Sequence, residues 1–502
     1  MFSLFLRGFT LVVIGLSLSY TAFGQSYAES ALLFSRTQPT GSARIQALGG
    51  AQIALGGDYS SALSNPAGLG MYNRSEFTLT PALNSYNTST NFLNNPAEES
   101  SSKLNIPGLS YVMHLPSQKG GDFVGGSFGL SMSRINDFNR TTLYAGRNEN
   151  TSIVDYFLEQ ANGDTPAQFD EYQFNTPTGL AFYNYLIGPQ SILDPPGPDD
   201  LYFTDAPIAS DQQEEIVTKG TSYQWSFSYG GNYKDIFFFG GGLGLTSLRY
   251  NSQKIFSEQY DSEIINNLEL TENLNIRGSG INATLGVLVR PVDFLQIGVS
   301  FTSPTYYQIT EKYDALMNTR WKNFDYWDGE KYVTLNDETA STDIIISEYN
   351  LTTPLKLSGG LAFMSKYGFI TGDIEMTNPA KARYSSDIDG ISFTSDNNTI
   401  KSIYKATVNY RIGAEFRYNI FRVRAGYNVQ SNSFEDNSLD NKITSISGGA
   451  GVKFDKFYID VALVNRKSDS FYSPYTLSDG AEPVVSIKNK TTLGMITLGF
   501  TF

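Results

Sequence analysis

The sequence contains no cysteine and a single histidine, His114. These absences exclude disulfides, thiolate metal sites and a cysteine nucleophile, and they leave no second histidine for a metal cage. Charged residues make up only 17% of the chain, below the roughly 25% of ordinary globular proteins. Acidic residues outnumber basic ones by 50 to 36, and the net charge of −14 disfavours binding to nucleic acid. Tyrosine (32), phenylalanine (34) and glycine (46) are abundant, which favours a β-rich protein whose surface partly faces something other than water.

The first residues have the three-part pattern of a secretory signal. A positively charged start precedes an apolar run over 9–18, and the small residues Ala22 and Gly24 precede a cut at Gln25. About ten apolar residues are too few for a membrane anchor, which needs roughly 20. No later run approaches 18 apolar residues and the mean hydropathy is −0.24, so no membrane-spanning helix is predicted after the leader. With 1–24 removed as a signal peptide, two classes remain, a secreted soluble β-protein and an outer-membrane β-barrel.

The C-terminus alternates with the period of a β-strand. One face carries Phe502, Phe500, Leu498, Ile496 and Gly494, and the other carries Thr501, Gly499, Thr497 and Met495. Successive side chains of a strand point to opposite faces, so this strand has one apolar face and one small or polar face. The terminal phenylalanine resembles the C-terminal signature of outer-membrane barrels, so the barrel-assembly machinery is an expected partner of Phe502. The stretches 405–418 and 456–464 repeat the alternation.

The lengths of the turns distinguish a membrane barrel from a soluble sandwich. Short turns, such as 366–368 and 455–456, alternate with long polar connections, the largest of which is 147–220. Outer-membrane barrels have this asymmetry, and a sandwich has no reason for it. We predict an all-β fold, a transmembrane antiparallel barrel of about fourteen strands: 75–83, 105–115, 122–145, 220–233, 235–257, 272–291, 292–311, 340–366, 367–388, 398–419, 420–433, 442–455, 456–472 and 488–502. An even number of strands puts the N- and C-termini on the same, periplasmic side.

The stretch ahead of the first strand, 25–73, does not follow the barrel pattern. It is small, apolar and glycine-rich, unlike a disordered segment. One interpretation is a flexible periplasmic leader. The other is a hatch folded into the lumen as a plug, because wall side chains alone fill a barrel of only about eight strands. We favour the hatch, and we expect 74–502 to form the barrel with its external loops.

Short motifs in this stretch resemble a known family. The motifs are Ala-Leu-Gly-Gly-Ala (47–51), Asp-Tyr-Ser-Ser-Ala (58–62) and Asn-Pro-Ala-Gly-Leu (65–69). They are similar to the hatch of the long-chain fatty-acid outer-membrane transporter family, the FadL/TodX-like proteins, which include aromatic-hydrocarbon channels. Further similarity at 353–362 and 411–427 extends the resemblance over essentially the whole mature chain. The resemblance implies a 14-stranded barrel, an N-terminal hatch, and downhill passage of hydrophobic molecules that enter from external loops and leave sideways through the wall. The large 147–220 loop and the hatch start at 26–34 depart from the family, so the substrate stays open.

The hatch motif holds the residues that are expected to fix the hatch against the wall: Asn65, Pro66, Ala67 and Gly68. Proline locks φ and removes a donor, and an asparagine side chain can bond to nearby backbone. Lumen-facing arginines either pair with carboxylates such as Glu415, Asp373 and Asp460 or bind a substrate carboxylate, for which Arg411 and Arg424 are the candidates. External aromatic residues, among them Tyr183, Trp321 and Trp327, line either an entrance groove or an interfacial girdle.

No catalytic, metal or cofactor site is predicted. His114 has no nucleophile motif beside it, and Gly240–Gly244 fits a strand kept thin where hatch or substrate comes close better than a phosphate loop. The favoured function is an outer-membrane channel of a Gram-negative bacterium for passive uptake of hydrophobic molecules such as long-chain fatty acids, with outer-membrane lipid and lipopolysaccharide as surroundings. Two alternatives stay open, an interaction or shuttle component of a secretion system or a surface adhesin, and a porin for polar solutes, which a plug argues against.

Overall fold

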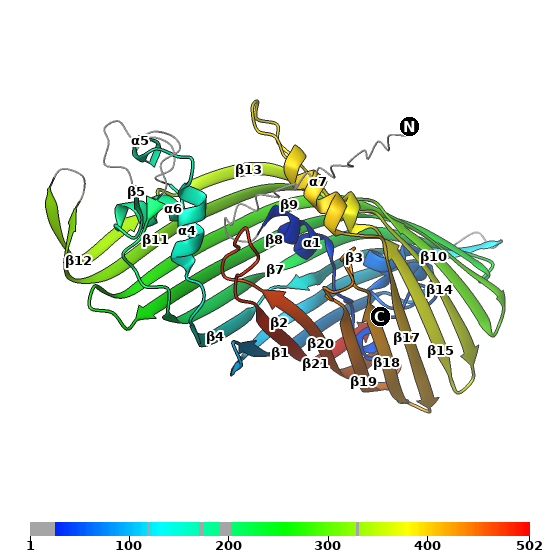
Figure 1. Ribbon diagram of the computed structural model, residues 1–502. Helices are drawn as coiled ribbons and strands as arrows, with labels where there is room; N and C mark the ends of the chain where they lie inside the picture. Colours follow the sequence, from blue (N-terminus) through cyan, green and yellow to red (C-terminus); the bar gives the residue numbers. More distant parts are fainter. Residues whose placement is uncertain (1–25, 118–120, 170–174, 190–201, 328–330) are drawn as a thin grey trace, which may run out of the picture.

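The computed structural model describes residues 26–117, 121–169, 175–189, 202–327 and 331–502, so the predicted signal peptide lies outside the described residues. The wall is one antiparallel sheet that closes on itself, because the first strand, β1 (Glu76–Phe92), pairs along its length with the last, β21 (Val485–Thr501) (Figure 1). Fourteen strands make up the closed wall, which confirms the predicted barrel. In the described ranges, no helix is long and apolar enough to cross a membrane.

Most wall strands are continuous and four are broken into two elements. The other continuous strands are β2 (Asn95–Pro116), β7 (Ser210–Tyr233), β8 (Phe237–Tyr260), β9 (Ile265–Val292), β17 (Thr407–Tyr418), β18 (Phe421–Gln430), β19 (Ile443–Lys453) and β20 (Phe457–Tyr472). The broken strands are β3 (Phe123–Asp137) with β4 (Arg140–Asn148), β10 (Leu295–Thr302) with β11 (Tyr306–Trp327), β13 (Ile345–Thr352) with β14 (Lys356–Ser365), and β15 (Gly368–Thr377) with β16 (Arg383–Ser385). Pro304, Pro354 and Pro379 occupy three of these breaks, where a missing ladder donor interrupts the strand. β12 (Tyr332–Ser341) pairs only with β11 and extends it as a hairpin.

Several predicted boundaries are wrong. The predicted strand 398–419 begins instead as the helix α7 (Thr394–Ile403). The sequence of α7 is mostly polar, and its two apolar residues, Ile400 and Ile403, are too few to indicate the helical period. The stretch 84–104 is not a loop, because β1 and β2 continue to a two-residue turn in which Leu93 and Asn94 both have positive φ. That hairpin escaped prediction because its outer part is polar on both faces. The 147–220 loop is likewise shorter than predicted, since β7 begins at Ser210.

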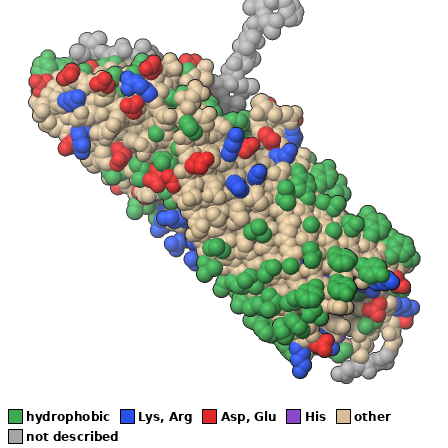
Figure 2. Space-filling model, turned by 90° about the horizontal axis from the view of Figure 1, so that it is seen from below, with side chains coloured by type: hydrophobic (Ala, Val, Ile, Leu, Met, Phe, Trp, Pro, Cys, Tyr) green, Lys and Arg blue, Asp and Glu red, His purple; other side chains and the backbone are tan. Residues whose placement is uncertain are grey.

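The wall consists of an apolar belt near the short turns and a polar part that extends beyond it. Figure 2 shows hydrophobic side chains gathered over one end of the molecule and charged side chains over the other. On β8 the outward side chains change from Phe239 and Leu245 in the belt to Arg249 and Gln253 beyond it. Since roughly 9–11 residues span a membrane, the 28 residues of β9 cross the belt and continue well past it.

The N-terminal segment, defined as residues 26–73, lies inside the barrel. It contains α1 (Tyr27–Ser35), α2 (Ala43–Ala47), α3 (Ser61–Ser64) and the 3-10 helix η1 (Pro66–Met71). α2 packs against β18–β21, and η1 packs against β3, β7, β8 and β9 on the other side of the barrel. The segment therefore bridges two sides of the wall at the level of the belt.

The longer connections cover the end of the barrel beyond the belt. They contain α4 (Ile153–Ala161), α5 (Pro166–Gln168), α6 (Pro177–Tyr183), β5 (Gly188–Pro189), β6 (Tyr202–Phe203), η3 (Pro379–Lys381) and α7. α6 contacts β11, and α7 contacts α1 of the N-terminal segment (Figure 1). Together with inward residues of β8, β9 and β11, these elements bury one large apolar cluster. The lumen beyond the belt is therefore lined by apolar side chains.

Candidate functional site

The predicted hatch motif meets the wall at a row of three glycines. Gly230, Gly240 and Gly286 are direct neighbours on β7, β8 and β9. η1 lies so close to this row that a Cβ on Gly240 would fall 2.3 Å from the carbonyl carbon of Pro66. The close approach of two backbones requires glycine here, as predicted for Gly240 from the sequence.

Asn65 holds the start of η1 in place. Its Nδ2 donates to a carbonyl of the N-terminal segment at 2.7 Å and to the wall carbonyl of Val287 at 3.4 Å, and its Oδ1 accepts from the Ala67 N–H at 3.2 Å. The Asn65 side chain is fully buried, so its removal would orphan partners at about 1–3 kcal/mol each. Pro66 is the first residue of η1, where no donor is needed, and the Gly68 N–H donates to the Asn65 carbonyl at 2.9 Å. The four predicted residues thus lie together at the wall, and their role as a gate stays a prediction.

A charged network joins the N-terminal segment to the opposite wall. Arg44 of α2 lies 3.7 Å from the Glu415 carboxylate, which also accepts from Arg424 Nε at 2.6 Å and from Arg417 Nε at 2.5 Å. Arg424 also donates to Asp460 at 2.6 Å. With its side chain only 4% exposed, Arg424 is fully engaged by two protein carboxylates.

Arg411 belongs to a neighbouring group on β15 and β17. It donates to Glu375 at 2.8 Å, and its Nε is buried without a partner. The adjacent Asp373 accepts backbone N–H bonds from Gln52 at 2.5 Å and from Ile53 at 2.9 Å, so this group also holds the N-terminal segment. Both arginines pair with protein carboxylates, which was one of the two alternatives for the lumen arginines. The other alternative, that Arg411 and Arg424 bind a substrate carboxylate, stays a prediction.

The ladder between β2 and β3 is incomplete. β2 pairs with β3 only over Gly108–Pro116, whereas Asn95–Asn105 pairs with β1 alone. Pro107 lies where β2 departs from β3, and the β1–β2 register shifts at Pro81. A proline cannot donate to a ladder, so Pro107 coincides with the end of the β2–β3 pairing, whereas β1 continues to pair with β2 and β21 beyond Pro81. We call this interruption the wall break.

Side chains take the place of backbone bonds at the wall break. Lys103 Nζ on β2 donates to Asn139 Oδ1 at 2.8 Å, and the Tyr223 hydroxyl on β7 donates to the Ile106 carbonyl at 3.4 Å. On the outside, Leu104 and Ile106 are 76% and 48% exposed, so the break opens at the edge of the apolar belt. Pro107 is the signal in the sequence that could have indicated this site, which was not predicted.

A cavity of about 70 Å³ lies just inside the wall break. Three arginines line it, Arg134 and Arg140 from β3 and β4 and Arg466 from β20. The N-terminal segment reaches the same place, because the Gln38 N–H donates to the Ile135 carbonyl on β3 at 2.9 Å and Gln38 lines the cavity. The cavity is thus lined by the N-terminal segment and by the wall, next to the wall break.

The predicted aromatic residues lie at two separate places. Trp321 is buried, and its Nε1 donates to the carbonyl of Asn184, the residue directly after Tyr183, at 3.2 Å. Trp327 lies at the end of β11, is 40% exposed and contacts Tyr332 across the hairpin. Trp321 therefore lies at the C-terminal end of α6, which Tyr183 ends, and Trp327 lies at the hairpin instead. A shared entrance groove stays a prediction.

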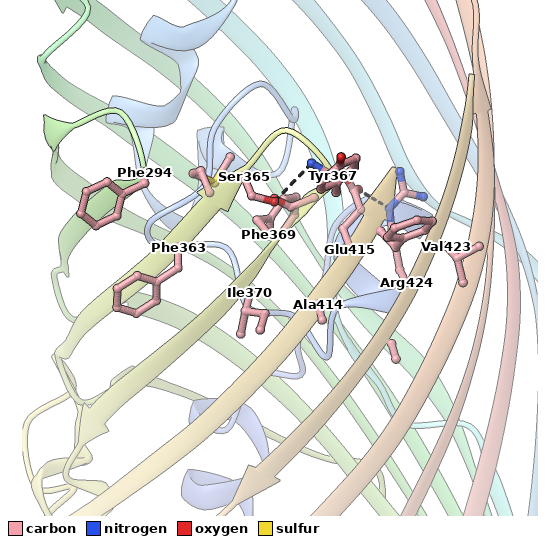
Figure 3. A pocket seen from close by; sticks show the side chains of 14 residues that line it. Phe294, Phe363, Ser365, Tyr367, Phe369, Ile370, Ala414, Glu415, Val423 and Arg424 are labelled. Carbon is pink, nitrogen blue, oxygen red and sulfur yellow. Dashed lines mark hydrogen bonds and ion pairs between the residues drawn. The ribbon is translucent and has the colours of Figure 1, made fainter. Parts of the chain in front are cut away.

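A shallow groove of about 540 Å³ lies on the outer face of β14, β15, β17 and β18 (Figure 3). Ala414 and Ala425 form its floor, and Phe363, Ile370 and Phe416, all more than half exposed, stand beside it. These side chains point outward within the apolar belt. The groove is part of the belt's surface.

Glu258 anchors the cover over the lumen, far beyond the belt on β8. Its buried carboxylate accepts from Ser152 Oγ at 2.5 Å, the Ile153 N–H at 2.9 Å and Gln212 Nε2 at 2.8 Å, and also from the Tyr260 hydroxyl. Burial raises the pKa of Glu258 above its usual 4.5, and the hydrogen bonds oppose that rise. The start of α4 is thereby tied to the wall.

The described residues include one histidine, His114, and many carboxylates. Within them, no three histidine, aspartate or glutamate side chains form a group that could hold a metal ion. His114 on β2 lies 3.2 Å from the Ser127 hydroxyl of β3, at the end of the wall near the short turns. His114 and Ser127 are direct partners across the ladder between β2 and β3.

Comparisons with known proteins identify the fold. Neither a protein-family model nor a curated sequence matches the chain. A Pseudomonas aeruginosa FadL homologue matches with a TM-score of 0.56 and 13% identity over 93% of this chain and 99% of that one. The P. putida toluene transporter TodX matches with a TM-score of 0.52 and 12% identity over 92% and 98%. The resemblance drawn from the hatch motifs is confirmed as a shared fold.

Proposed function

We propose that the protein is an outer-membrane channel of a Gram-negative bacterium for passive uptake of hydrophobic molecules, with both chain termini in the periplasm. The apolar belt supports a membrane location, since it surrounds a β-sheet wall that closes on itself. The solved structures with this fold are described as a FadL homologue and a toluene transporter. Long-chain fatty acids are the substrates we favour.

The wall break is the observation that carries this proposal. A sheet in lipid has strong reason to complete its ladders, because each orphaned group costs several kcal/mol. Here the β2–β3 ladder ends at Pro107 at the edge of the belt, and side chains that can rotate away cover the gap. The N-terminal segment fills the lumen at the belt, so a path straight along the barrel axis is obstructed. A sideways exit through the break is the path that remains.

The lumen beyond the belt suits an apolar solute. Phe34 of α1, Phe138 and Tyr250 meet edge to face, with ring centroids 5.5 to 5.9 Å apart, above the cavity at the break. Each CH₂ moved from water to such surroundings contributes about 0.8 kcal/mol, so a long alkyl chain is held without an energy source. Rearrangement of these rings would open a path for the alkyl chain from the covered lumen to the wall break.

A cross-link across the wall break tests the proposal. Because the chain has no cysteine, Lys103→Cys with Asn139→Cys can be joined by a short bis-maleimide without background reaction. We expect the cross-link to abolish uptake of a labelled hexadecanoic acid into proteoliposomes. The matched control is Thr444→Cys with Lys467→Cys, which joins direct neighbours across an intact ladder. Uptake that persists with the break closed, or is lost equally in the control, would contradict the sideways exit.

A further inference from the structure

Four basic side chains lie together on the outer face of the wall. Arg249 and Arg277 are direct partners across the ladder between β8 and β9. Lys219 on β7 lies diagonal to Arg249, and Lys312 on β11 lies diagonal to Arg277. All four side chains are exposed. We call these four residues the basic patch.

Protein carboxylates do not neutralise the basic patch. Among the described residues, none of the four belongs to an ion pair. Glu348 lies one strand away on β13, opposite Thr310, and Asp314 accepts from Asn273 Nδ2 at 2.9 Å. Like charges that face each other directly across a ladder destabilise a sheet. An anion from outside the chain would remove the repulsion between Arg249 and Arg277.

The basic patch follows directly on the apolar belt. On the same four strands, the last row of the belt consists of direct ladder neighbours, each at least 40% exposed: Trp225, Leu245, Ile281 and Tyr306. Tryptophan and tyrosine are enriched at membrane–water interfaces, so this row marks the edge of the hydrocarbon. Arg249 follows Leu245 by four residues, which is about 10 Å in height for a strand tilted by about 40°. Long basic side chains at this height reach the lipid head groups.

The side of the membrane indicates which lipid the patch faces. The patch lies on the side of the long connections, which face the outside in outer-membrane barrels. The outer leaflet of that membrane consists of lipopolysaccharide, a glycolipid whose phosphate groups lie next to its acyl chains. Guanidinium groups suit phosphate oxygens, which they bind through paired hydrogen bonds. Three strand spacings make the patch about 14 Å wide, so it can contact more than one phosphate.

We propose that the basic patch binds the phosphate groups of lipopolysaccharide, whose acyl chains lie along the apolar belt beside Leu245 and Ile281. This inference uses the outer-membrane location of the proposed function and goes beyond uptake, because it assigns a lipid partner to the outer wall. Lipopolysaccharide thereby changes from general surroundings to a ligand of named residues.

Lipid binding to the purified full chain tests the patch. The delipidated protein in detergent is titrated with bisphosphorylated lipid A or with phosphatidylglycerol, and native mass spectrometry counts the bound lipid. EDTA is present, so that divalent cations cannot join phosphates to carboxylates. We expect lipid A to bind about fivefold or more tightly than phosphatidylglycerol, since its second phosphate engages at least one further basic side chain. Added salt should weaken the binding of lipid A.

Variants assign the binding to these residues. Arg249→Gln with Arg277→Gln should weaken the binding of lipid A about 25-fold, because each basic side chain near an anionic surface contributes about a factor of five. Arg249→Lys with Arg277→Lys keeps the charge and should keep most of the affinity. The matched control is Arg320→Gln with Lys322→Gln, which removes the same charge from β11 farther beyond the belt and should leave the affinity unchanged.

Thermal unfolding gives a second readout with an opposite sign. Without lipid, Arg249→Gln with Arg277→Gln should unfold at a higher temperature than the unmodified protein, because the repulsion across the ladder is removed. Lipid A should raise the unfolding temperature of the unmodified protein and have a smaller effect on the variant. A lower unfolding temperature of the lipid-free variant would mean that the chain itself stabilises the two arginines, and it would contradict the argument from repulsion.

The remaining outcomes separate this inference from the proposed function. Equal affinity of the unmodified protein and the double glutamine variant for lipid A would overturn the site. Equal affinity for lipid A and phosphatidylglycerol would overturn lipopolysaccharide as its partner. Uptake of hexadecanoic acid into phosphatidylcholine proteoliposomes, which contain no lipopolysaccharide, should be the same in that variant and the unmodified protein. A loss of uptake confined to the variant would place the two arginines in the uptake path and overturn their assignment to the lipid surface.

Discussion

Adding one methyl group at Gly240 should release the N-terminal segment from the wall. The new Cβ would fall 2.3 Å from the Pro66 carbonyl carbon and 2.5 Å from the Ala67 nitrogen, whereas real Cβ atoms keep at least 3.0 Å. Both neighbours are backbone atoms, so η1 must move as a unit, at a cost of about 1–3 kcal/mol for overpacking. The neighbouring Gly241 is the matched control, because a Cβ there meets only the end of the Leu285 side chain, at 3.2 Å, and a carbonyl oxygen at 3.9 Å.

Maleimide labelling of a reporter cysteine measures the release. Ser61→Cys is suited to this, because Ser61 is 2% exposed in α3, next to η1, and the chain has no other cysteine. A cost of about 1–3 kcal/mol raises the population of the released segment about fivefold to a hundredfold, and the labelling rate with it. Gly240→Ala should show this increase and Gly241→Ala should not. Equal rates in the two variants, with the barrel assembled in both, would refute the close-contact argument.

Three further predictions concern the N-terminal segment and the cover. Asn65→Ala with Pro66→Ala should reduce uptake of labelled hexadecanoic acid, while heat-modifiable gel migration shows an assembled barrel; normal uptake would refute the coupling. Deletion of 26–57 should raise single-channel conductance in planar bilayers, and an unchanged conductance would contradict a plug. Because the pKa of Glu258 is raised in the folded protein, its contribution to stability is full below its usual value of 4.5 and is lost as the pH rises through the raised pKa. Glu258→Gln should remove that component from the pH dependence of thermal unfolding, and an identical pH profile in the variant would contradict it.

The sequence was sufficient to predict the barrel because the belt imposes a strict alternation. Phe500 and Ile496 on β21 are exposed in the belt, and Thr497 and Met495 are buried on the lumen side, as predicted. Beyond the belt this rule reverses, because water lies outside and the apolar cluster inside. The outer part of the β1–β2 hairpin is polar on both faces, so it shows no alternation and was predicted as a loop.

The candidate site was only partly predictable. The Asn65 motif could be located because glycine, proline and asparagine have local conformational roles that sequence spacing reveals. The roles of Arg411 and Arg424 could not be settled, because their partners come from other strands whose register the sequence does not determine. Arg140 and Arg466 were not singled out at all, since 326 positions separate them and only closure of the barrel brings them to one cavity.

Photo-cross-linking from the wall break tests the central claim most directly. A photoreactive phenylalanine analogue at Ile106, whose side chain is 48% exposed where β2 departs from β3, would sample any molecule that passes through. The control position is Ile446 on β19, which is 67% exposed over an intact ladder. We predict that radiolabelled hexadecanoic acid, supplied from the side of the long connections, is captured at position 106 well above the level at position 446. Equal capture at the two positions would mean that the acid reaches both only from the surrounding lipid, and it would contradict passage through the wall.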